Sequence, residues 1–123
     1  MDDFRLGAVE ARFADIIWEN APLTSGELVK LCADQLEWKK STTYTVLKKL
    51  CERGLFQNNG GTVTVRMTKQ DYSAHQSQKF VEEAFNGSLP AFIAAFAAGK
   101  RLSSQDLEDI RQMLDTYDKE ELK

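Results

Sequence analysis

The chain has 123 residues, of which 42% are hydrophobic and 28% are charged, a composition typical of one or two small globular domains. The formal net charge of −3 gives no support for nucleic-acid binding on its own, so such a function requires basic residues to be concentrated locally. The N-terminus lacks a basic stretch followed by an apolar one, and the longest apolar run, residues 89–98, is shorter than the about 20 residues of a membrane span. We therefore expect a soluble, cytoplasmic protein that does not associate with a membrane.

The first part of the chain predicts three helices. Apolar residues recur at helical spacing within the first 20 residues, and Pro22 ends this pattern. Residues 24–27, Thr-Ser-Gly-Glu, carry the capping-box signature that opens a second helix. A third helix is predicted to begin near Ser41 and to stop at Gly54, because glycine is favoured just after a helix. The residues of the third helix that are predicted to face inward are Thr43, Val46, Leu47 and Leu50.

Two strands follow these helices, at residues 55–58 and 62–68. The segment 58–61 contains Asn-Gly, which favours a tight hairpin because both central residues of the preferred turn need positive φ. In the second strand apolar and polar residues alternate, so that Arg66 is expected on the outer face. Three helices followed by a hairpin is the order of a winged helix-turn-helix. The predicted fold is therefore mainly α with a small β-hairpin wing, and this DNA-binding domain spans residues 1–70.

Residues 71–123 predict a second, helical domain that mediates dimerisation. Four of the seven phenylalanines fall between positions 80 and 96, in short helices that cannot easily bury their apolar faces on one another alone. We expect these faces to pack against a second copy in a two-fold homodimer. The alternative is a monomer in which these helices fold back on the winged helix. The candidate interface residues are Phe80, Phe85, Phe92, Phe96, Leu107, Ile110 and Leu114.

Basic residues are concentrated between positions 39 and 69, where seven lysines and arginines stand against the single acid Glu52. A basic helix beside a basic wing suits a groove of double-stranded DNA and its two phosphate backbones. Lysines are expected to contact phosphates, whereas hydroxyls near the start of a helix can reach base edges or phosphates. The candidate DNA-binding residues are Ser41, Thr42, Tyr44, Thr45, Lys48, Lys49 and Arg66.

Other kinds of function compete with DNA binding as explanations of this sequence. A lysine-rich helix face is also compatible with a winged helix that binds a protein partner, and this alternative stays open. Enzymatic function is not expected, because the single histidine, His75, has no nucleophile or acid patterned around it. Cys32 and Cys51 lack the close spacing of metal ligands, so we expect buried free thiols, no metal site and no cofactor.

Three segments of the chain resemble the penicillinase repressor family, the BlaI/MecI/CopY group. They are IIWENAPLTSGELVKLC at 16–32, WKKSTTYTVLKKLCERGLF at 38–56 and LSSQDLEDIRQML at 102–114. The resemblance implies a homodimeric transcriptional repressor whose winged helix binds palindromic operators and whose C-terminal helices hold the dimer together. Staphylococcal-type members have arginine where this chain has Tyr44. The recognition residues that the resemblance carries to this chain are Ser41, Thr42, Tyr44 and Thr45.

Two positions depart from the pattern of the family. Members that are controlled by a membrane sensor protease are cut between asparagine and phenylalanine, and this bond aligns with Ala95-Phe96. The resemblance thus implies a sensor protease as a further partner, but Ala95 replaces the asparagine of the cleaved bond. Copper-responsive members carry a C-terminal cysteine cluster, whereas this chain ends in TYDKEELK. Copper sensing by that route is therefore not expected.

Overall fold

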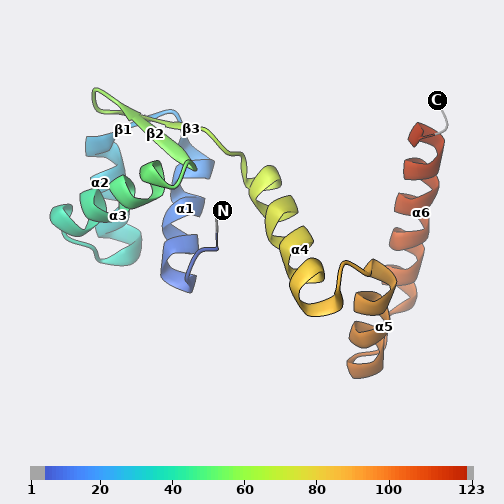
Figure 1. Cartoon of the computed structure of the whole chain (residues 1–123). Coiled ribbons are helices and arrows are strands. Elements are labelled where there is room, and N and C mark those ends of the chain that lie inside the picture. Colours follow the sequence, from blue (N-terminus) through green and yellow to red (C-terminus); the bar gives the residue numbers. More distant parts are fainter. Residues whose placement is uncertain (1–4, 122–123) are drawn as a thin grey trace. The chain divides into compact units, whose positions relative to one another are not determined.

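The computed structural model describes residues 5–121, which form six helices and one small antiparallel sheet (Figure 1). These residues divide into two compact units between Lys79 and Phe80. The first unit contains three helices, the sheet and the beginning of helix α4 (Lys69–Phe85), and the second contains the end of α4 and two further helices. The predicted fold class, mainly α with a small β wing, is confirmed.

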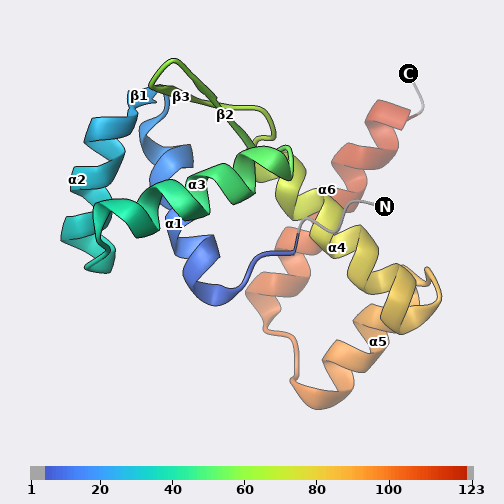
Figure 2. The same cartoon turned by 60° about the vertical axis from the view of Figure 1, so that its left-hand side comes forward.

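The three predicted N-terminal helices are present as α1 (Ala8–Asn20), α2 (Ser25–Leu36) and α3 (Lys40–Glu52). The predicted capping box opens α2: the Thr24 hydroxyl accepts a hydrogen bond from the Glu27 backbone N–H at 3.1 Å, and the Glu27 carboxylate accepts one from the Thr24 N–H at 3.0 Å. These contacts satisfy two amides that the helix itself leaves without acceptors. A short connection leads from α2 to α3, as in a helix-turn-helix (Figure 2).

The sheet has three strands in the order β1-β3-β2, namely β1 (Leu23–Thr24), β2 (Phe56–Asn59) and β3 (Thr62–Val65). Strand β1 was not predicted, because two residues are too short to show an alternating pattern. Asn59 pairs with Thr62, so the two central turn residues are both glycines, with φ of 59° and 96°. The prediction that Asn-Gly occupies the centre of the turn was therefore wrong, although the reason for a hairpin there, positive φ, is retained.

Strand β3 is shorter than predicted and ends at Val65. The backbone N–H groups of Arg66 and Met67 both donate to the carbonyl of Leu55, at 2.9 and 3.0 Å, and this double contact takes the chain out of the regular ladder. Arg66 consequently lies just after β3 and not on the outer face of the strand, but it is exposed.

A closed hydrophobic core joins the three helices and the sheet of the first unit. Trp18 extends this core to α4, because its ring lies 5.5 Å from the rings of both Phe56 and Tyr72 and its Nε1 donates to the Met67 carbonyl at 2.9 Å. The core residues with no exposed surface include Phe13, Ile17, Leu28, Leu50, Leu55, Phe56 and Val63.

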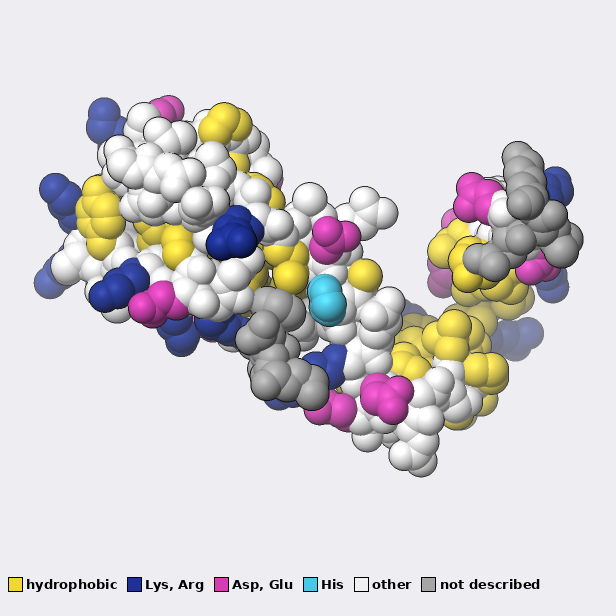
Figure 3. Space-filling model, turned by 45° about the horizontal axis from the view of Figure 1, so that its top comes forward, with side chains coloured by type: hydrophobic (Ala, Val, Ile, Leu, Met, Phe, Trp, Pro, Cys, Tyr) yellow, Lys and Arg dark blue, Asp and Glu magenta, His cyan; other side chains and the backbone are white. Residues whose placement is uncertain are grey.

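The second unit contains the end of α4, α5 (Leu89–Gly99) and α6 (Ser104–Glu121). Ser88 caps α5 by accepting from the Ala91 N–H at 3.1 Å, and Pro90 occupies its first turn as predicted. No residue between positions 80 and 120 is buried, and hydrophobic side chains lie open on these helices (Figure 3). The phenylalanines contact one another through ring pairs with centroids 5.6–6.4 Å apart, which involve Phe80, Phe85, Phe92 and Phe96.

Candidate nucleic-acid interface

Helix α3 buries one side and exposes the other. Thr43, Leu47 and Leu50 are buried, as predicted, and Val46 is half-buried. The buried Thr43 hydroxyl is satisfied, because it donates to the Lys39 carbonyl at 3.3 Å. The six predicted DNA-binding residues of this helix are all exposed, namely Ser41, Thr42, Tyr44, Thr45, Lys48 and Lys49.

Two hydroxyls on this exposed side have defined partners. Thr45 donates to the Ser41 carbonyl at 2.9 Å, which leaves its oxygen able to accept from a ligand. The Tyr44 hydroxyl donates to the Ser25 hydroxyl at 3.0 Å, and the Ser25 backbone N–H donates to the Gly61 carbonyl at 2.8 Å. Ser25 therefore connects α3, the start of α2 and the tip of the wing. This role of Ser25 was not predicted, since the two partners of the hydroxyl pair are 19 residues apart in the sequence.

A groove of about 500 Å³ lies between α3 and the wing, and both Lys48 and Arg66 line it. Cys51, half-buried, also borders the groove, and burial raises the pKa of its thiol, so the uncharged form predominates near neutral pH. The expectation of a buried thiol holds for Cys32 and only in part for Cys51. The remaining residues of the groove are Tyr44, Leu47, Phe56, Gln57, Asn58 and Asn59.

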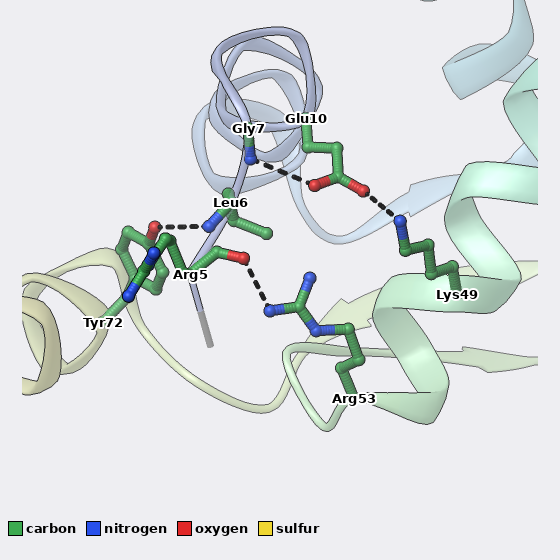
Figure 4. Close-up of polar contacts among 7 residues, drawn as sticks. All are labelled: Arg5, Leu6, Gly7, Glu10, Lys49, Arg53 and Tyr72. Carbon is green, nitrogen blue, oxygen red and sulfur yellow. Dashed lines mark hydrogen bonds and ion pairs between the residues drawn. The ribbon is translucent and has the colours of Figure 1, made fainter. Parts of the chain in front are cut away.

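Part of the predicted basic cluster is engaged within the protein. Lys49 pairs with Glu10 at 2.8 Å, and Lys69 pairs with Asp15 at 2.9 Å. Arg53 donates from Nη2 to the Arg5 carbonyl at 2.7 Å (Figure 4). These contacts have no local signal in the sequence, because their partners lie on or before α1. The basic surface that is open to a ligand is thus narrower than the residue count indicated.

Lys48 and Arg66 differ from these engaged cations. Among residues 5–121, the structure gives neither side chain an ion pair or a hydrogen bond, and both residues are exposed. Two residues of the ion pairs described above also have shifted pKa values. The hydrogen bond from Lys49, and to a smaller extent that from the Gly7 N–H, lowers the pKa of Glu10. The hydrogen bond to Asp15 raises the pKa of Lys69.

The described residues offer neither a cluster of metal ligands nor a membrane-spanning helix. Histidine, cysteine and acidic side chains form no group of three that could hold a metal ion among residues 5–121. His75 is exposed on α4. Within the same residues, no helix is both long enough and apolar enough to cross a membrane.

The sequence of this chain matches a known protein family. Residues 6–116 match the family described as penicillinase repressor. The chain belongs to the penicillinase repressor family. It is similar to the penicillinase repressor of Bacillus licheniformis, with 23% identity over 92% of this chain and 91% of the relative. It is also similar to the methicillin resistance regulatory protein MecI of Staphylococcus aureus, with 18% identity over 90% and 94%.

Membership of this family confirms the resemblance seen in the sequence and makes the chain a DNA-binding transcriptional regulator, not an enzyme.

Among solved structures, a MarR protein from Peptoclostridium difficile matches with 17% identity and a TM-score of 0.42, over 94% of this chain and 70% of that one. A Staphylococcus aureus MarR, solved with salicylate and kanamycin, matches with 15% identity and a TM-score of 0.42, over 95% and 74%.

Proposed function

We propose that this regulator is a homodimeric repressor that binds palindromic operator DNA, each protomer placing α3 in a major groove and its wing against the flanking backbone. The observation that carries the proposal is the position of Lys48 and Arg66 on an exposed surface beside the hydroxyls of α3, opposite a fully closed core. Such a surface meets the two requirements of a DNA reader, phosphate attraction and polar groups within reach of base edges.

The proposed roles follow from the chemistry of each side chain. Lys48, Lys49 and Arg66 are assigned to phosphates, because lysine and arginine side chains neutralise the negative charge of the DNA backbone. The exposed N-terminal turn of α3 offers backbone amides that also favour phosphate. The residues assigned to base edges and to the adjacent sugar-phosphate are Ser41, Thr42, Tyr44 and Thr45.

The second unit supplies the dimer in this proposal. Phe80, Phe96 and Leu114 keep 53%, 50% and 59% of their surfaces exposed, which is unusual for large apolar side chains of a soluble protein. A second copy would cover these surfaces, and Phe85, Phe92, Leu107 and Ile110 lie on the same helices. Two α3 helices would then read half-sites about 34 Å apart, or a small multiple of this distance.

Repression would result from occupation of a promoter in the cytoplasm, and release from loss of the dimer. Two linked DNA-binding units bind far more tightly than one, so separation of the protomers would empty the operator. A membrane sensor protease is one proposed cause of release, acting near Ala95 and Phe96 on the exposed helix α5. The relative MecI is named as a regulator of methicillin resistance.

Titration of fluorescent duplex DNA with the full-length protein at several salt concentrations tests the proposal. The expected result is a linear fall of the logarithm of the binding constant with the logarithm of salt concentration, with a slope of about −0.9 per phosphate contacted. Absence of any salt-dependent binding would contradict it.

That outcome would favour the second candidate, a dimeric winged helix that binds a protein. One observation supports this candidate: three of the seven basic residues between positions 39 and 69 form an ion pair or a hydrogen bond with groups of the protein itself.

A further inference from the structure

The carboxylate of Glu10, on α1, lies next to Lys49 of α3, which is one of the proposed phosphate contacts. Lys49 Nζ lies 2.8 Å from Glu10 Oε2, and the other carboxylate oxygen, Oε1, accepts from the Gly7 backbone N–H at 3.1 Å (Figure 4). Glu10 is therefore anchored at the start of α1 by a contact that does not involve Lys49. A carboxylate held in this way can occupy the ammonium group before DNA arrives.

Two further hydrogen bonds fix the segment that presents this carboxylate. The Leu6 N–H donates to the Tyr72 hydroxyl at 3.3 Å, and Arg53 donates to the Arg5 carbonyl at 2.7 Å. The two members of the ion pair differ in exposure, at 22% for the Glu10 side chain and 59% for that of Lys49. The anchored partner is thus the acid, and the movable partner is the lysine with its flexible stem.

The energies allow DNA to displace this acid. An exposed ion pair changes an equilibrium constant by no more than about fivefold. A lysine that neutralises a DNA phosphate also releases a condensed counterion, which favours binding at low salt. Lys49 can therefore exchange the carboxylate for a phosphate, but the gain is reduced by the pair that is lost.

We propose that Glu10 lowers the DNA affinity of this protein: its carboxylate occupies Lys49 in the free protein, and a DNA phosphate must displace it. This inference rests on the proposed function of α3. It has one direct consequence, that Lys49 contributes less to binding than Lys48, which has no such internal competitor among the described residues.

The test is duplex binding by full-length Glu10→Gln at low salt. The amide keeps a carbonyl oxygen that can accept from Gly7 but removes the charge, so the Kd is expected to fall by about two- to fivefold per bound protomer. Glu10→Ala should lower the Kd by the same factor. Equal effects of the two variants would show that the loss of the negative charge, and not the amide of glutamine, increases the affinity for DNA. The matched control is Asp34→Asn, which removes one negative charge from an exposed position of α2 and should change the Kd less.

A double-mutant cycle with Lys49→Ala locates the effect. If Glu10 acts through Lys49, the gain from Glu10→Gln disappears when Lys49 is alanine. Unchanged or weaker binding by Glu10→Gln overturns the inference, as does a gain that persists in the double variant. When the wild-type protein binds duplex DNA with a clear salt slope, these outcomes affect Glu10 alone. Lack of salt-dependent binding by the wild type instead removes the proposed function, and this inference with it.

Discussion

The two units of this chain differ in how much of their apolar surface is buried. In the first, side chains such as Phe13, Leu50 and Phe56 are fully enclosed by three helices and a sheet. In the second, no residue between positions 80 and 120 is buried, although α5 consists almost entirely of apolar residues. The first unit therefore has the core of an independent domain, whereas the second leaves large apolar side chains exposed.

Because of this difference, we expect the first unit to determine the stability of the fold and the second to determine the oligomeric state. The polar and basic side of α3 is exposed, whereas its other side is held in a closed core. The apolar helices of the second unit bury too little within one copy to be self-sufficient, and in our proposal a second copy completes them. Substitutions in the first unit should thus change folding or recognition, and those in the second should change oligomeric state.

The largest effect is expected for Phe96→Asp, which places a charge on the half-exposed apolar surface of α5. We expect a monomer in sedimentation velocity, together with a loss of DNA affinity of about 10²- to 10⁴-fold, because linked binding is lost. Thr116→Asp, on the polar side of α6, is the matched control and should remain dimeric. Sedimentation of Phe96→Asp as an intact dimer would remove this residue from the interface.

Phe13→Ala should destabilise the first unit by about 3–5 kcal/mol, because it opens a cavity in a closed core. Both tryptophans, Trp18 and Trp38, contact this core, so urea unfolding followed by tryptophan fluorescence reports on the first unit. Phe92→Ala in the second unit should move this transition much less. Equal shifts for the two variants would show that the units do not differ as described.

Lys48→Ala should leave folding unchanged and flatten the salt dependence of DNA binding by about 0.9 per protomer, the contribution of one phosphate contact. Lys30→Ala, which removes the same charge from an exposed position of α2, should leave the slope as in the wild type. The slopes are measured by fluorescence anisotropy across a salt series. Identical slopes for Lys48→Ala and the wild type would exclude Lys48 from the footprint.

The smallest effect concerns the capping box of α2. Hydrogen bonds from Thr24 lower the pKa of Glu27 in the folded protein below its ordinary value of 4.5. The ionised Glu27 therefore stabilises the fold fully above its ordinary pKa, and this stabilisation is lost as the pH falls through the lowered pKa. Glu27→Gln should therefore reduce the fall of the melting temperature between neutral pH and about pH 3. A fall as steep as that of the wild type would assign the acid sensitivity to other carboxylates.

Local patterns in the sequence predicted much of this structure. The capping box at Thr24 and Glu27 and the buried side of α3 were both correct, because each depends on residues within one or two turns of a helix. The predicted exposure of the α3 hydroxyls follows directly from that buried side.

Contacts between distant segments were not predicted. Strand β1 forms only because Leu23 pairs with Val63 across the fold, and Lys49 meets Glu10 through the packing of α3 near α1. The turn was placed one residue too early, because two glycines, Gly60 and Gly61, satisfy positive φ better than Asn59 and Gly60. Counting charges along the chain also overestimated the basic surface that is available to a ligand, because Lys49, Lys69 and Arg53 contact groups of the protein itself.

Footprinting of the full-length protein on the DNA upstream of its own gene tests the central proposal most directly. Our account predicts two protected half-sites related by two-fold symmetry, with centres one helical turn or a small multiple apart, and both are expected to become accessible together in the Phe96→Asp variant. Protection of a single unpaired site, or of none at any salt concentration, would contradict it.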